Sequence, residues 1–327
     1  MKNNSLGRTG AQVSPLCLGC MNFGGTTNDA DSIAIMHRAL DAGLFFWDTA
    51  DVYSRGKSEL VVGKALQNRR DEVFLATKGH GKMGDGPNDS GNSRFHLIKA
   101  CEDSLQRLGV DHIDLYQIHR PQSSVPIDET LRALDDLITA GKIRYIGTST
   151  FAAYQLVESL WESEKLGLNR FVCEQPPYNI LDRRIERELL PFCAKYGFGV
   201  IPWSPLAGGV LTGKYQRDQS APEDSRYKEG KFREGKPINE ATWKVIDGVR
   251  DLSDQKGAAM DAFALAWVMA QKTISSPIIG PRTMEQLEGN LKALEVQISD
   301  EDNQKVDELV APGTHVVEYY GADFGKR

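Results

Sequence analysis

Short apolar runs alternate with amphipathic stretches along almost the whole chain. The runs are rich in Val, Ile, Leu and Phe, which is typical of strands buried on both faces of a parallel sheet. The predicted strands are Leu16–Gly19, Leu44–Asp48, Val73–Lys78, Ile113–His119, Ile143–Ser149, Phe171–Gln175, Gly199–Trp203 and Ile274–Gly280. The predicted helices are Asp29–Ala42, Ser58–Gln67, Arg94–Leu108, Asp128–Ala140, Ala152–Leu166, Arg183–Lys195, Ala259–Gln271 and Met284–Leu294.

This order repeats a strand followed by a helix eight times, with no break in composition that would mark a linker. Eight such units close most naturally into a barrel. We therefore predict the α/β class and a single domain over residues 1–327, folded as a (β/α)8 TIM barrel.

Three segments fall outside the repeat. The turn sequence Arg8-Thr9-Gly10 predicts an N-terminal β-hairpin, which could plug the barrel floor. A long loop, Gly208–Pro237, follows the seventh strand and leads into a helix from about Asn239 to Gln255. The chain ends in further C-terminal helices and a tail, Pro312–Arg327, that we expect over the top of the barrel.

The overall charge argues against several classes of partner. Lys and Arg number 39 and Asp and Glu number 45, so the net charge is −6, without a basic block. We expect no nucleic-acid partner and no membrane partner. No apolar run is long enough to cross a bilayer and no signal peptide is recognisable, so a cytoplasmic location is expected.

Cysteine usage predicts reduced thiols and no metal site. The five cysteines are an odd number in a long chain. Cys17 and Cys20 form a C-x-x-C pair, but they lie in an extended segment rather than at a helix N-terminus, where a redox motif belongs.

Four polar residues mark the carboxyl ends of consecutive strands. The second run ends in Asp48, the third in Lys78 and the fourth in His119, and Tyr53 follows Asp48 by five residues. In a β/α barrel the chemistry lies where strands end and loops begin. We therefore expect these four side chains to meet at one mouth of the barrel.

Such a set suits carbonyl reduction, in which negative charge builds on the oxygen and must be stabilised and then protonated. We expect Lys78 to lower the pKa of Tyr53, and Asp48 to hold Lys78 charged. A neutral His119 would donate a second hydrogen bond to the carbonyl oxygen. Each residue alone also fits a structural role as a cap, an ion-pair partner or a core histidine, but four at equivalent places favour catalysis.

The same positions carry a family resemblance. Residues 46–53, 76–78 and 114–119 resemble the catalytic tetrad of the aldo-keto reductases, and residues 6–10 and 18–21 resemble other parts of that superfamily. The similarity runs through nearly the whole chain. It implies that Tyr53 is the general acid, supported by Asp48, Lys78 and His119. It also implies an oxidoreductase that reduces small aldehydes or ketones, with sugars as one candidate class.

The resemblance further implies a site for NADPH (NADP⁺). Ser149 and Gln175 match positions that bind the nicotinamide carboxamide, and Trp203 matches the aromatic residue on which the ring stacks. Arg282, at a helix N-terminus, suits a 2′-phosphate and so favours NADPH over NADH. The implied cofactor-binding positions are Met21, Ser149, Gln175, Trp203, Ser204, Leu206, Gly208, Lys214, Arg226, Gly280, Arg282, Gln286 and Asn290. Thr150 departs from the pattern, because many relatives have Asn there.

Two motifs are misleading. Gly79–Gly84 spells G-x-G-x-x-G after a strand, but the next helix is expected only near Arg94, whereas a Rossmann loop opens directly into one. Gly208–Tyr215 is close to a P-loop, but Tyr215 stands where Mg²⁺ requires Ser or Thr. We expect neither a Rossmann fold nor an NTPase.

A second function remains open. The potassium-channel β subunits share the superfamily, and by that resemblance the chain would be a cofactor-sensing regulatory subunit. The complete set of Asp48, Tyr53, Lys78 and His119 favours an enzyme. Neither the physiological substrate nor the oligomeric state follows from the sequence.

Overall fold

The computed structural model of the chain describes residues 2–217, 219, 222, 225 and 238–317. Within these residues, eight parallel strands form one sheet in the order β10-β3-β4-β5-β6-β7-β8-β9. The strands are β3 (Cys17–Gly19), β4 (Phe46–Asp48), β5 (Phe74–Gly79), β6 (Ile113–Ile118), β7 (Ile143–Ser149), β8 (Cys173–Gln175), β9 (Gly199–Val200) and β10 (Ile278–Ile279). Each lies within one of the eight predicted runs, except that β5 extends one residue further.

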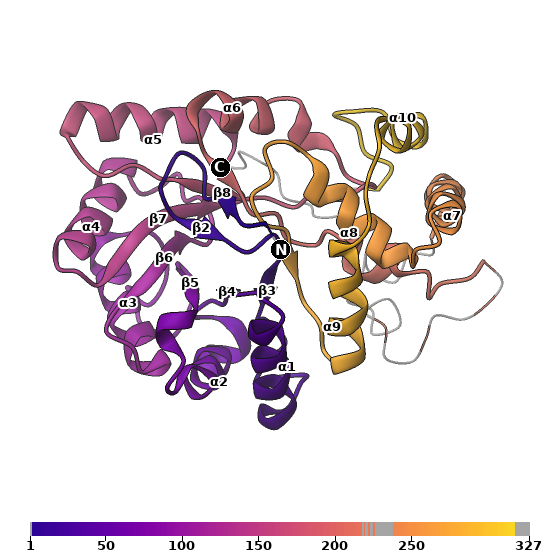
Figure 1. Cartoon of the computed structure of the whole chain (residues 1–327). Coiled ribbons are helices and arrows are strands. Elements are labelled where there is room, and N and C mark those ends of the chain that lie inside the picture. Colours follow the sequence, from indigo (N-terminus) through magenta and orange to yellow (C-terminus); the bar gives the residue numbers. More distant parts are fainter. Residues whose placement is uncertain (1, 218, 220–221, 223–224, 226–237, 318–327) are drawn as a thin grey trace.

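The sheet curls round on itself (Figure 1), and backbone hydrogen bonds join the two ends of this order into a closed barrel. Val200 of β9 forms a parallel bridge with Ile274, which lies just before β10. Ser275 N donates to Val200 O at 2.7 Å, and Ile278 N donates to Pro202 O at 2.8 Å. The predicted (β/α)8 TIM barrel is therefore confirmed.

The helices surround the strands, as Figure 1 shows. They are α1 (Asp29–Asp41), α2 (Lys57–Leu66), α3 (Arg94–Leu108), α4 (Ile127–Thr139), α5 (Ala153–Leu166), α6 (Leu189–Tyr196), α7 (Glu240–Gln255), α8 (Met260–Ala270), α9 (Met284–Leu291) and α10 (Asp300–Leu309). Helix α7 follows the long loop after β9, and α10 follows the last barrel helix, as the sequence predicts. None of these helices is long and apolar enough to span a bilayer.

Two of the predicted helices are interrupted. In place of one helix over Arg183–Lys195, the chain forms a short 3₁₀ turn, η3 (Arg184–Glu186), and then α6. Pro191 is the third residue of α6 and has no N–H, so it fits only the first turn of a helix and prevents an unbroken one. The second interrupted helix is the one predicted over Met284–Leu294. Here α9 ends at Leu291, and the chain continues as a 3₁₀ turn, η6 (Lys292–Leu294).

The core has two layers. A large cluster fills the space between the strands and the helices. A smaller cluster fills the inside of the barrel at its amino-terminal end, where it includes Phe46, Leu115 and Ile201. Cys17 and Cys20 are also buried, and burial raises the pKa of both thiols well above the usual range. This agrees with thiols that stay reduced and take no part in chemistry.

The predicted N-terminal hairpin is present as the antiparallel pair β1 (Asn4–Ser5) and β2 (Gln12–Val13). Leu6 and Val13 are fully buried in the inner cluster, so the hairpin plugs the barrel floor. Gly7 lies in the turn with a φ of +58°, and a Cβ there would come within 2.5 Å of Gly199 N. Only glycine allows this close approach without strain.

Candidate active site

The four predicted catalytic residues lie on three successive strand–loop units. Asp48 is the last residue of β4 and Lys78 is the penultimate residue of β5. His119 directly follows β6, and Tyr53 opens the 3₁₀ turn η1 (Tyr53–Gly56) before α2. Because β4, β5 and β6 are parallel neighbours, their carboxyl ends share one rim.

Lys78 lies at the centre of this group. Its Nζ is 2.5 Å from Asp48 Oδ2, 2.7 Å from Thr49 O and 3.2 Å from the hydroxyl of Tyr53. The rings of Tyr53 and His119 meet edge to face, with centroids 5.6 Å apart. The structure therefore brings all four predicted side chains together.

Burial and charge set the protonation states in the group. Burial disfavours the charged form of Lys78, but the nearby Asp48 and Tyr53 outweigh this effect and raise the pKa of Lys78. Burial, together with Lys78, Arg120 and His80, holds the pKa of His119 well below its ordinary value. At neutral pH, Lys78 is therefore an ammonium and His119 a neutral imidazole.

The effect of Lys78 on Tyr53 has the expected direction, but burial outweighs it. Burial is the larger effect and raises the pKa of Tyr53, whereas Lys78 lowers this pKa, as expected, and offsets only part of the increase. In the free protein Tyr53 is a protonated phenol, and thus a hydrogen-bond donor, over the physiological range.

The turn after Tyr53 is made of unusual backbone conformations. Ser54, Arg55 and Gly56 have φ values of +50°, +55° and +84°. Non-glycine residues rarely adopt this region, and such strain tends to occur at functional sites. The turn sends the chain directly from the Tyr53 position into α2.

The residues expected to bind a nicotinamide carboxamide are adjacent. Ser149 ends β7 and Gln175 ends β8, and they are partners in the parallel pairing of these strands. Ser149 Oγ donates to Gln175 O at 2.9 Å. Trp203 lies beyond β9, half-buried and packed against the inner barrel cluster. These three side chains occupy the same rim as Lys78.

Thr150 follows Ser149 in a left-handed conformation, with a φ of +66°. A β-branched residue seldom adopts this region, so the surroundings must hold it there. Thr150 N donates to Gln175 O at 3.3 Å, and Arg120 Nη1 donates to Thr150 Oγ1 at 3.2 Å. These bonds hold the turn with Thr at a position where the family resemblance implies Asn.

Residues 280–290 contain Arg282, the residue expected to bind the 2′-phosphate. The start of this segment contacts the loop between β3 and α1. Asn22 Nδ2 donates to Gly280 O at 3.2 Å, and Thr27 Oγ1 donates to Arg282 O at 3.2 Å. Met21 is exposed on the same loop. These bonds fix the backbone of Arg282 just ahead of the N-terminus of α9.

Two hydrogen bonds organise the start of α9. Thr283 Oγ1 accepts from Gln286 N at 3.2 Å and caps the helix. The side chain of Gln286, however, accepts at Oε1 from Arg282 N at 2.8 Å rather than from Thr283 N. The NH₂ group of Gln286 is then the part of this side chain that is left to face a ligand. Asn290 lies one turn further along α9 and is largely buried.

The loop after β9 carries the remaining predicted positions. Ser204 and Gly208 have φ values of +57° and +64°, on either side of Leu206. Lys214 is exposed, with its Nζ 5.3 Å from the ring centroid of Tyr215. Arg226 lies outside the described residues. The described ones among these predicted cofactor-binding positions thus come after Trp203 in one irregular segment, which includes the 3₁₀ turn η4 (Ala207–Thr212).

Sequence reasoning missed two residues at the rim. Gln117, on β6, donates from Nε2 to Asp48 Oδ1 at 2.9 Å and is fully buried. Arg120 follows His119 and donates from Nη1 to the carbonyl oxygen of His119 at 2.6 Å. Strand alternation could have identified Gln117, because Leu115, Gln117 and His119 share one face.

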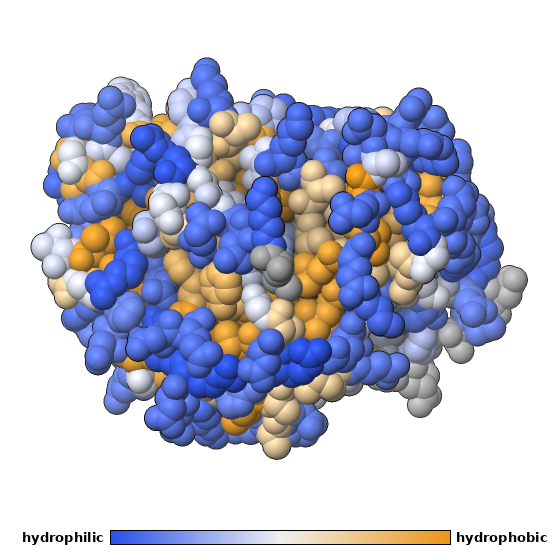
Figure 2. All heavy atoms as spheres, viewed as in Figure 1, coloured by the Kyte–Doolittle hydropathy of each residue, from blue (hydrophilic) through white to orange (hydrophobic). Residues whose placement is uncertain are grey.

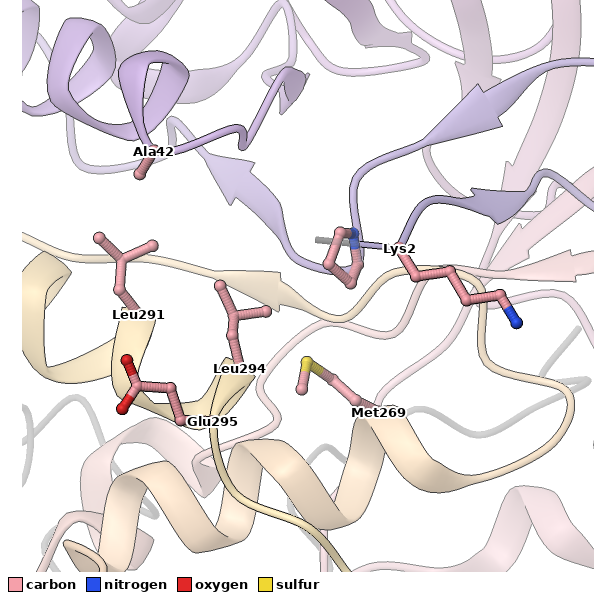
Figure 3. A pocket seen from close by; sticks show the side chains of 7 residues that line it. Lys2, Ala42, Met269, Leu291, Leu294 and Glu295 are labelled. Atoms are coloured by element: carbon pink, nitrogen blue, oxygen red, sulfur yellow. The ribbon is translucent and has the colours of Figure 1, made fainter.

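An apolar hollow on the amino-terminal face of the barrel is unrelated to this polar group. Figure 2 shows apolar side chains exposed near the middle of that face. The hollow measures about 480 Å³ and is lined mainly by aliphatic residues (Figure 3), namely Lys2, Pro15, Ala42, Met269, Leu291, Leu294 and Glu295. It lies at the opposite ends of the strands from Lys78.

Two aromatic residues near the carboxyl ends of β4 and β8 are core residues. Trp47 and Tyr178 are completely buried; Trp47 donates from Nε1 to Leu44 O, and Tyr178 donates its hydroxyl proton to Glu186. His80, at the start of the loop after β5, remains partly exposed. No cluster of three metal-ligating side chains occurs among the described residues.

Comparison with known proteins agrees with this geometry. The model of the Aldo/keto reductase family matches residues 15–311. The Bacillus subtilis protein named Uncharacterized oxidoreductase YrpG is 38% identical over 332 residues, which cover 98% of this chain and 99% of that protein. A probable voltage-gated potassium channel subunit beta of Oryza sativa is 36% identical, over 90% of this chain and 92% of its own. Versiconal hemiacetal acetate reductase of Aspergillus parasiticus is 32% identical, over 95% and 98%.

Proposed function

Because the chain belongs to the aldo/keto reductase family, and is thus an oxidoreductase that uses a nicotinamide cofactor, we propose that it reduces aldehyde or ketone carbonyls to alcohols with NADPH. The observation that carries this proposal is the position of Lys78, whose ammonium contacts both the carboxylate of Asp48 and the hydroxyl of Tyr53. The substrate is a small molecule, and the site of reaction is the rim formed by β4, β5 and β6.

The proposed roles depend on the protonation states. A bound NADPH supplies the hydride. Tyr53 then donates its phenolic proton to the substrate oxygen as negative charge builds there, and neutral His119 donates a second hydrogen bond to the same oxygen. Lys78 stabilises the phenolate that Tyr53 leaves behind, and Asp48 keeps Lys78 charged and in place.

The chain offers fitting groups for the cofactor. Ser149 and Gln175 would hold the carboxamide, and Trp203 would stack on the ring. Arg282, ahead of the N-terminus of α9, would bind the 2′-phosphate that distinguishes NADPH from NADH. Met21, Ser204, Leu206, Gly208, Lys214, Gly280, Gln286 and Asn290 would complete the site, and Arg226, outside the described residues, is proposed with them.

Tyr53→Phe tests the proposal. The variant keeps the ring but has no proton to donate, so kcat for a reducible carbonyl should fall at least about 100-fold. The affinity for NADPH should stay within about twofold, because Tyr53 is assigned to proton transfer. The measurements are NADPH oxidation with a panel of aldehydes and ketones, and fluorescence titration of NADPH.

Tyr145→Phe is the matched control. Tyr145 lies on β7 at the other end of the barrel, where it stacks on Phe74, and loss of its hydroxyl should leave kcat near the original value. Full activity of Tyr53→Phe would contradict the proposed proton donor. Loss of NADPH binding in that variant would mean that Tyr53 holds the cofactor instead.

The relatives named as channel subunits favour one second candidate, a cofactor-sensing regulatory subunit. Such a protein would bind NADPH through the same residues without needing turnover. NADPH binding combined with the absence of reduction across a broad carbonyl panel would support this function over the enzyme.

A further inference from the structure

A small polar network lies inside the barrel, directly beneath Lys78. It joins Asp48 of β4, Gln117 of β6 and Gln175 of β8, and each of these residues is at most 2% exposed. Gln117 Nε2 is 2.9 Å from Asp48 Oδ1, Gln175 Nε2 is 3.0 Å from the same oxygen, and Gln175 Nε2 is 3.0 Å from Gln117 Oε1. The three residues form a layer from alternate strands, as is usual inside such barrels.

The hydrogen bonds fix the orientation of both amides. The carboxylate of Asp48 only accepts hydrogen bonds, so each glutamine must turn its NH₂ group toward it. The second N–H of Gln175 then meets Gln117 Oε1. If the amide of Gln175 were flipped, its carbonyl oxygen would face the Asp48 carboxylate and the Gln117 oxygen. Buried acceptor oxygens that face one another without a donor between them cost free energy. Gln175 Oε1 therefore points away from both.

A glycine makes room for this contact. Gln117 and Gln175 belong to strands that β7 separates. The residue of β7 between them is Gly147. It pairs with Gln117 on β6 and with Cys173 on β8. A Cβ at Gly147 would lie 3.3 Å from Gln117 Cγ and 2.5 Å from Cys173 Sγ. Without a side chain at Gly147, amides from β6 and β8 can meet across β7.

From this network we propose that Gln117 is a positioning residue that holds Gln175 in one orientation, with Oε1 presented as an acceptor for the NH₂ group of the nicotinamide carboxamide. The inference rests on the proposed function, which assigns Gln175 and Ser149 to that carboxamide. Gln117 also joins this contact to Asp48, Lys78 and Tyr53 through a continuous series of hydrogen bonds. The orientation of the cofactor and the position of the proton donor are thereby set by the same carboxylate.

The test compares two cofactors that differ only at the group in question. In the reduced 3-acetylpyridine analogue of NADPH, a methyl group replaces the NH₂ of the carboxamide. The unmodified protein should bind NADPH about 3- to 10-fold more tightly than the analogue, the range for one net hydrogen bond. In Gln117→Met, which keeps the length of the side chain, the NH₂ group of Gln175 loses one of its two acceptors and keeps only Asp48 Oδ1. The amide of Gln175 is then held less firmly, and the preference should fall below about twofold.

Two further variants separate positioning from general damage. Gln117→Glu keeps an acceptor for Gln175, so it should retain most of the preference for NADPH even if its activity falls. Leu115→Val alters the same face of β6 one layer lower, among apolar side chains, and should keep the full preference. Thermal melting of each variant verifies that it is folded, and fluorescence titration measures both affinities.

The outcomes distinguish the inference from the proposed function. An unchanged preference in folded Gln117→Met would overturn the inference while leaving the function standing. If Gln117→Met does not fold, loss of the preference in Gln117→Glu would overturn it instead. Failure of the unmodified protein to bind NADPH at all would contradict the proposed function itself.

Discussion

At the scale of single residues, two buried carboxyl groups near the rim differ in what compensates their burial. Asp48 has the ammonium of Lys78 beside it. Glu174, on β8, receives hydrogen bonds from the hydroxyl of Thr148 and from the backbone N–H groups of Thr150 and Phe151. Neutral donors compensate a buried negative charge less well than a cation, and burial raises the pKa of Glu174 to about 8.

The raised pKa of Glu174 predicts a pH dependence of stability. Folded Glu174 keeps its proton up to about pH 8, whereas in the unfolded chain it loses the proton near its ordinary value of 4.5. Its contribution is therefore fully present below pH 4.5 and is lost as the pH rises through 8. The loss amounts to roughly 5 kcal/mol, because a tenfold change in acidity is worth about 1.4 kcal/mol.

Glu174→Gln should remove this component. The free energy of unfolding, measured by urea denaturation from pH 5 to pH 8.5, should fall less steeply in the variant than in the unmodified protein. Glu158→Gln, on the exposed face of α5, serves as the control and should keep the original slope. Equal slopes in all three proteins would show that folded Glu174 ionises like an exposed glutamate.

At the scale of elements, the turns and the plug position the site more than the strands do. The strands are short and bring the polar residues to one rim, but residues in left-handed conformations set the direction of the chain beyond several of them. After Ser149 the turn contains Thr150, and the loop after β9 contains Ser204. The hairpin β1–β2 closes the opposite end, so the packed floor and the reactive rim are separate parts of one barrel.

Gly7→Ala tests the docking of the hairpin. The added methyl group would meet the backbone of Gly199 at 2.5 Å in a conformation that alanine disfavours, so we expect a loss of at least about 2 kcal/mol. Urea denaturation measures the change. Gly10→Ala in the same hairpin turn is the matched control, because a Cβ there meets nothing within 4 Å and its cost should stay near or below about 0.5 kcal/mol. Similar costs at the two glycines would mean that the hairpin is not held against β9.

At the scale of the whole molecule, the proposed cofactor residues come from distant parts of the chain. Ser149 and Gln175 lie in the middle of the sequence, whereas Arg282 and Gln286 belong to the last barrel unit. The unit containing Arg282 is held to the first one, through Asn22 and Thr27. A ligand that touches all of these residues binds the closed barrel and not the unfolded chain, so it stabilises the fold as a whole.

NADPH should therefore raise the melting temperature, and the size of the increase should depend on Arg282. At about 100 times the Kd, binding contributes about 2.7 kcal/mol. In Arg282→Ala the increase produced by NADPH should shrink markedly, because the 2′-phosphate loses a charge-assisted partner, while the increase produced by NADH should change little. Differential scanning calorimetry with both cofactors measures the effect. Equal reductions for NADPH and NADH would contradict the assignment of Arg282 to the 2′-phosphate.

Several features of the protein follow from the sequence alone. Apolar periodicity is a local property, so it predicts the eight strands and most helices close to their observed bounds. Parallel strands must bring their carboxyl ends to one rim, so Asp48, Lys78 and His119 can be grouped before any coordinates are known. Tyr53 joins them because it lies only one short turn beyond Asp48.

Other features were decided only by the tertiary structure. The contact of Gln117 with Gln175 crosses a strand and depends on the curvature of the barrel and the missing side chain of Gly147. The direction of the pKa of Tyr53 depends on how deeply it is buried, which a charge pattern does not reveal. Local patterns determine what each segment can form, whereas burial and partners from distant strands depend on how the closed barrel packs.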